Sequence, residues 1–176
     1  MQKNIANALL FNAVWLLCVL GGNVVALFST LALLLAHFRF VSSDWRELVL
    51  ALQALVIGFF VDAMMLQSGV LIAPDASVMP PAWLLCLWVA FSTTLNHSMA
   101  WLQNRLLLSV LVGALLVPLS YYAGTRLTDF ALAEPLWRSI AMVGASWALV
   151  LPLLAWLAVR NRERFLLSRE GLVERG

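Results

Sequence analysis

The feature that most constrains this chain is the length of its uncharged apolar segments. Residues 5–38 contain no charged side chain, and several similar segments follow. The hydrocarbon core of a bilayer is about 30 Å thick, and a helix of about 20 apolar residues crosses it. Charged residues make up only 11% of the chain and the mean hydropathy is +0.93, whereas about a quarter of the residues of a soluble domain are charged. The sequence therefore predicts an integral membrane protein.

The apolar segments predict an all-α fold, a polytopic transmembrane helix bundle with six spans. Residues 5–40 would form a single helix on the order of 54 Å long, and Gly21-Gly22-Asn23 near the middle is a turn signal. We therefore expect two short helices there; one kinked span, giving five in all, is the alternative. The expected spans are residues 5–20, 24–40, 48–70, 82–102, 106–123 and 136–159.

Basic residues are distributed unequally between the two sides of this six-span arrangement. Cytoplasmic loops carry an excess of Lys and Arg, so the richer side is expected to be cytoplasmic, with both termini on it. Residues 1–159 would form one transmembrane domain and residues 160–176 a charged cytoplasmic tail, either amphipathic along the headgroups or solvated. The richer side holds Lys3, Arg39, Arg46, Arg105, Arg160, Arg162, Arg164, Arg169 and Arg175, and the other side holds Arg126 and Arg138.

Asp62, within the expected third span, is the clearest candidate functional residue, because ionisable groups are costly inside a membrane. A carboxylate there must be protonated, paired or in contact with water. One interpretation is a proton, cation or substrate site. The other is a tie between helices, to Arg138 or to a neighbouring hydroxyl.

A second polar cluster, residues 92–98, lies in the expected fourth span. On a helix Thr93, His97 and Trp101 would share one face, with Asn96 on an adjacent stripe, so these groups should face the bundle interior. They form either a substrate or proton-relay site or hydrogen bonds between helices. The helical rise separates Asp62 from His97 by about 10–15 Å in height, which makes Gln53 the expected partner of Asn96 and His97.

Neither a metal nor a cofactor is expected from the sequence. His97 has no His, Glu or Cys at the spacing of a local metal motif. His37 is interpreted as an interfacial residue without a special role, and Cys18 and Cys86 as small buried apolar side chains. The common catalytic motifs are absent from the sequence, so an enzyme is not indicated.

The chain resembles a family of small bacterial inner-membrane proteins known only as a domain of unknown function. The resemblance rests on residues 7–15, on Pro80-Pro81-Ala82-Trp83, and above all on Thr94-Leu95-Asn96-His97-Ser98. It implies a membrane-lipid context, because genes of that family often neighbour those for cyclopropane-type fatty-acyl modification. It transfers no catalytic residues.

These observations predict a multi-pass protein of the bacterial inner membrane that binds a lipid or another small hydrophobic ligand, or that assists membrane-lipid modification. Its expected partners are membrane lipids and a lipid-modifying enzyme; a net charge of +2 argues against nucleic acid. A proton-coupled permease using Asp62 and an intramembrane enzyme using His97 are the alternatives. The candidate site residues are Asp62, Gln53, Thr93, Asn96 and His97.

Overall fold

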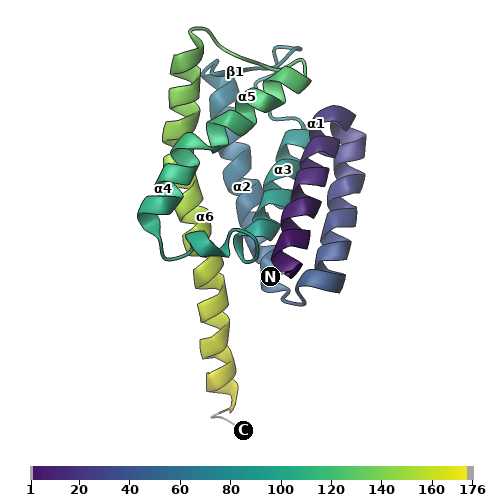
Figure 1. The fold of residues 1–176 in the computed structure, drawn as a ribbon, viewed down its shortest axis with the longest axis vertical. Coiled ribbons are helices and arrows are strands. Elements are labelled where there is room, and N and C mark those ends of the chain that lie inside the picture. Colours follow the sequence, from purple (N-terminus) through teal and green to yellow (C-terminus); the bar gives the residue numbers. More distant parts are fainter. Residues whose placement is uncertain (1, 174–176) are drawn as a thin grey trace.

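The computed structural model describes residues 2–173, with side chains described as far as residue 163, and it is helical apart from one short strand pair (Figure 1). Within this range, four segments are long and apolar enough to cross a membrane: Gln2–Val41, Arg46–Gln67, Leu106–Leu127 and Leu136–Glu163. The elements are α1 (Gln2–Ala36), the π-helix η1 (His37–Val41), α2 (Arg46–Gln67), β1 (Leu71–Ile72), α3 (Ala82–Leu95), the 3-10 helix η2 (Ala100–Leu102), α4 (Leu106–Leu115), α5 (Val117–Leu127), β2 (Ala131–Leu132) and α6 (Leu136–Val173).

The outer surface of the bundle is apolar. Large hydrophobic side chains of α1, α2, α4, α5 and α6 are more than half exposed, among them Leu9, Phe28, Phe60, Leu107 and Leu149. A soluble monomer rarely exposes apolar patches on this scale, whereas hydrocarbon solvates them. The structure thus agrees with the prediction of an all-α protein embedded in a membrane.

Helix α1 reverses direction at Gly22, so that its two halves lie antiparallel (Figure 1). Gly22 has φ 67° and ψ −167°, a combination that is essentially restricted to glycine. As a result the Cys18 thiol lies 3.8 Å from the Thr30 hydroxyl, although twelve positions separate the two residues. The expected turn at Gly21-Gly22-Asn23 is therefore present.

Helix α3 lies between α1 and α2 in the middle of the bundle (Figure 1). The expected span 82–102 is wrong at its C-terminal end, because the helix stops at Leu95 and turns and η2 follow. The hydroxyls of Thr93 and Thr94 donate to the carbonyls of Ala90 and Phe91, each at 2.7 Å. Side chains that bond to nearby carbonyls compete with the helical backbone pattern, which favours an end here.

The expected span 106–123 is divided into α4 and α5 and extends to Leu127. Pro118 lacks an N–H and cannot continue the backbone pattern of α4. A side chain on Gly113 would collide with the Trp147 carbonyl, so α4 packs closely against α6. Helix α5 is consequently free to tilt away from the direction of α4, toward α1 (Figure 1).

Contacts define two ends of the bundle. At one, which we call the strand end, β1 pairs antiparallel with β2 and the Asn23 side chain accepts a hydrogen bond from the Trp83 N–H at 3.0 Å. At the other, the arginine end, Arg46 donates to the Arg162 carbonyl at 3.1 Å and Arg162 donates to Gln103 at 2.6 Å. The helix that contains the expected sixth span, residues 136–159, continues to Val173 and extends past the arginine end (Figure 1).

Candidate functional site

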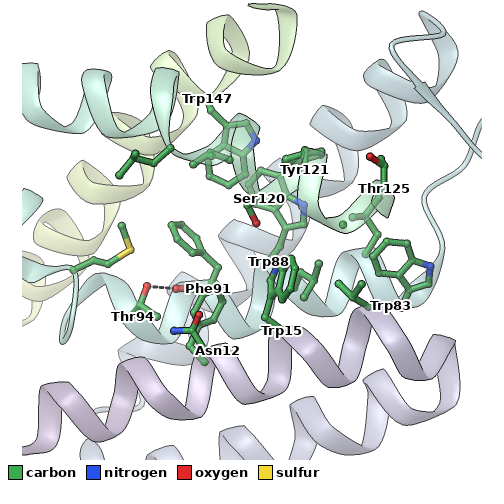
Figure 2. Close-up of a pocket in the computed structure, with 18 of the residues that line it drawn as sticks. Asn12, Trp15, Trp83, Trp88, Phe91, Thr94, Ser120, Tyr121, Thr125 and Trp147 are labelled. Carbon is green, nitrogen blue, oxygen red and sulfur yellow. Dashed lines mark hydrogen bonds between the residues drawn. The ribbon is translucent and has the colours of Figure 1, made fainter. Parts of the chain in front are cut away.

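A cavity of about 570 Å³ lies between the first half of α1, α3 and α5. Its lining is mainly aromatic and aliphatic, and Figure 2 shows the rings that face it. Small-molecule sites in proteins are typically apolar cavities of about 300–1,000 Å³ with a few polar groups. The rings labelled in Figure 2 belong to Trp15, Trp83, Trp88, Phe91, Tyr121 and Trp147.

The rim of this cavity reaches the outer surface between α1 and α5. Asn12, Leu116 and Ser120 line the cavity and are also exposed. Leu116 marks the break between α4 and α5, so the bend at that point shapes the rim. An opening therefore lies on the side of the bundle between α1 and α5, while Leu71 and Trp83 of the strand end also line the cavity.

Asp62 stands directly behind the cavity wall and is fully buried, with 0% of its surface exposed. Its Oδ2 accepts a hydrogen bond from Trp88 Nε1 at 2.6 Å, and its Oδ1 accepts one from the Tyr121 hydroxyl at 2.7 Å. Both donors line the cavity. Asp62 thus fixes two wall residues from α3 and α5, and its partners are a hydroxyl and an indole rather than Arg138.

Aromatic stacking holds the same wall together. The rings of Trp88 and Trp147 are stacked, with centroids 4.6 Å apart and an interplanar angle of 14°. A side chain on Gly58 would collide with the Trp88 ring, so the glycine makes room for it. Trp147 Nε1 is buried near the Tyr121 hydroxyl and forms no hydrogen bond with any residue in the described part of the chain. In the cavity wall the Tyr121 hydroxyl is thus the neighbouring acceptor toward this indole donor.

The remaining predicted residues do not meet at this cavity. Gln53 accepts a hydrogen bond from Asn161 at 2.8 Å, and Asn96 accepts one from Gln103 at 3.0 Å. The expected pairing of Gln53 with His97 is therefore wrong. Because α3 ends at Leu95, the expected helical face shared by Thr93 and His97 does not form. The cavity is lined instead by their neighbours, Thr94 and Ser98.

Asn7 joins α1 to the end of α3, a role that the sequence did not reveal. It is fully buried and donates to the Thr93 carbonyl at 3.1 Å. Its own side-chain oxygen accepts hydrogen bonds from the Ser98 N–H and hydroxyl at 3.3 and 2.7 Å. An asparagine within an apolar helix indicates a buried hydrogen bond. The sequence does not show its partners, because Thr93 and Ser98 lie more than eighty positions away.

A second polar centre lies at the arginine end, where two histidines converge on Glu47. His37 Nε2 lies 2.5 Å from Glu47 Oε2, and His97 Nε2 lies 3.0 Å from Glu47 Oε1. His37, expected from the sequence to have no special role, is buried with only 1% exposed and contacts the Glu47 carboxylate. Donor atoms of the three residues lie within 4.8 Å of one another, the spacing of a possible metal centre. Local motifs could not reveal it, because the three residues come from separate parts of the chain.

Apolar helices around an aromatic cavity define a polytopic membrane protein with an internal cavity. Within this class, the chain belongs to the family described as "Protein of unknown function (DUF2878)", whose model matches residues 4–153. The resemblance drawn from the sequence to a domain-of-unknown-function family is thereby confirmed. Comparisons with curated proteins and with solved structures find no match.

Proposed function

We propose that the protein binds the acyl chain of a lipid, or another small hydrophobic molecule, in the cavity between α1 and α5. The observation that carries this proposal is the sideways opening of an aromatic cavity through an apolar outer surface. A ligand dissolved in the bilayer would reach such an opening without crossing water, and burial of its methylene groups against the rings would stabilise it.

Polar groups near the opening would receive the polar end of such a ligand. Asn12, Ser120 and Thr125 line the cavity and carry amide or hydroxyl groups, and deeper in the wall Trp147 Nε1 offers a donor. Asp62 positions Trp88 and Tyr121 by hydrogen bonds. Because this tie accounts for the buried carboxylate, we propose binding rather than proton-coupled transport through Asp62.

For the membrane arrangement we propose six crossings of a bacterial inner membrane, with both termini in the cytoplasm. Support comes from the reversal of α1 at Gly22, which makes two antiparallel halves. Helix α3 has 14 residues and is about 21 Å long, so the turns after Leu95 would complete its crossing. The arginine end, with Arg46 and Arg162 side by side, would face the cytoplasm. Ligand delivery to a membrane-lipid-modifying enzyme is the role we propose for the bound molecule.

Reporter fusions test this arrangement. Alkaline phosphatase joined after Gly22, Asp75 or Asp129 is expected to be active, because each site lies in a loop on the proposed outer side. A fusion after Gln103 is the inactive control. An inactive fusion after Gly22, with active fusions after Asp75 and Asp129, would contradict the six-crossing proposal.

Ligand binding is tested with a dibrominated fatty acid, since bromine quenches tryptophan fluorescence on contact and four tryptophans line the cavity. We expect saturable quenching of the purified protein in detergent micelles. Ser120→Phe places a ring in the opening. It should lower the affinity for the fatty acid, measured by this quenching, by about tenfold or more, which corresponds to a loss of roughly 1.4 kcal/mol of binding free energy.

The matched control is Leu119→Phe, on the adjacent residue, which is exposed and does not line the cavity. It should leave the quenching curve unchanged. Equal curves for Ser120→Phe, Leu119→Phe and the wild-type protein would refute binding in this cavity.

A further inference from the structure

The sequence contains two histidines, and the fold brings both to the same carboxylate. His37 comes from the π-helix η1, Glu47 from the first turn of α2, and His97 from the turn after α3. In the described part of the chain, His37 Nδ1 has no hydrogen-bond partner, so the contact with Glu47 alone orients the polar side of that ring. Residues from three separate parts of the fold thus meet in one buried polar cluster.

We propose that His37, Glu47 and His97 form a binding site for a divalent first-row transition metal, with Zn²⁺ as the representative ion. Two imidazoles and one carboxylate make up a known three-residue zinc ligand set, in which a water or another small ligand completes the coordination. This proposal rests on the cluster alone and is independent of the ligand proposed for the cavity.

The distances suit a metal with only small movements. Ligand atoms about 2.1 Å from a tetrahedral zinc ion lie about 3.4 Å from one another. Glu47 Oε1 and Oε2 lie 3.0 and 3.2 Å from His97 Nε2, and the contact between His37 and Glu47 is 2.5 Å long. Because the three ligand atoms lie within 4.8 Å of one another, ring movements on the order of 1 Å would bring them to the spacing of a zinc site.

The surroundings hold the carboxylate in place. The Ser42 hydroxyl donates to Glu47 Oε1 at 2.9 Å, and the Ser42 N–H donates to the His37 carbonyl at 2.9 Å. Hydrogen bonds of this kind orient metal ligands and raise affinity. The π-helix gives His37 its register, and single π-turns are frequent at functional sites.

The burial of the three side chains also supports a metal site. The exposed fractions of His37, Glu47 and His97 are 1%, 9% and 16%. A dication would pair directly with the carboxylate while both imidazoles stay neutral, and buried charged groups in proteins are typically paired or bound to a metal. The slight exposure of His97 marks the side from which an ion would enter.

The test uses purified, tag-free protein in detergent, stripped with a chelator, loaded with Zn²⁺ and desalted. We expect about one Zn²⁺ per chain. Glu47→Gln and His97→Gln should each lower the affinity for Zn²⁺ by more than about tenfold. Asp44→Asn is the matched control, because Asp44 is a carboxylate at the same end that pairs with Arg46, and it should bind like the wild-type protein.

A second measurement depends on the wild-type protein alone. Loaded with Cu²⁺, it should give an electron paramagnetic resonance spectrum with splitting from two imidazole nitrogens, since no other histidine exists in the chain. Zinc content below about 0.1 per chain, Zn²⁺ affinity unaffected by both substitutions, or a Cu²⁺ spectrum without nitrogen splitting would each overturn the proposal. If the variants fail to fold, the Cu²⁺ spectrum decides.

Discussion

Replacing Tyr121 with Phe removes one hydroxyl and keeps the ring that lines the cavity. That hydroxyl donates to Asp62 Oδ1 at 2.7 Å, and Asp62 is fully buried. The substitution therefore leaves a buried oxygen with no donor, for which the typical penalty is about 1–3 kcal/mol. We expect the free energy of unfolding to fall by that amount, with the Trp88 bond to Oδ2 retained.

The measurement is reversible unfolding in mixed micelles, driven by an increasing mole fraction of SDS and followed by tryptophan fluorescence. Tyr122→Phe is the matched control: the adjacent tyrosine is 39% exposed, and a surface change of this kind usually alters stability by no more than about 0.5 kcal/mol. Equal unfolding curves for Tyr121→Phe and Tyr122→Phe would refute the view that Asp62 ties the cavity wall together.

Two further predictions concern glycines, measured by the same unfolding assay. Gly58→Ala should destabilise the protein by about 1–3 kcal/mol, because the new methyl group collides with Trp88. Gly124→Ala is the control and should be neutral or stabilising, because a Cβ there has nothing within 4 Å. Similar losses of stability for both variants would contradict the close contact between Gly58 and Trp88. Gly22→Ala should cost about 1–3 kcal/mol through backbone strain alone, since its Cβ has open space around it, and an unchanged midpoint would show that the reversal of α1 does not depend on this conformation.

Several features of the fold follow from the sequence because they depend on local composition. Long apolar segments predict membrane-embedded helices. The turn at Gly21-Gly22-Asn23 can be predicted from the sequence because glycine adopts a positive φ, as Gly22 does, without steric cost. The end of α3 at Leu95 is harder to foresee. Residues 96–102 contain no charged side chain that would end a span, and the hydrogen bonds of the threonine hydroxyls favour the helix end.

The candidate sites depend on contacts between distant positions. Asp62 stands out in the sequence as a carboxylate in an apolar helix, but its partners Trp88 and Tyr121 were not foreseen, because tyrosine and tryptophan also occur as ordinary packing residues. The sequence marks His97 as a candidate but not its partner Glu47, because the helix dipole favours acidic residues in the first turn of any helix.

The sequence by itself determined that the chain consists of apolar helices and which few polar residues those helices must shelter, since the transfer of side chains between water and hydrocarbon depends on residue type alone. Only the tertiary structure decided which of these residues meet. The tilt of α5 after Pro118 opened the aromatic cavity, and the packing of α1, α2 and the end of α3 brought His37, Glu47 and His97 together. Helix crossing and tilt depend on the fit of whole surfaces, which no local pattern encodes.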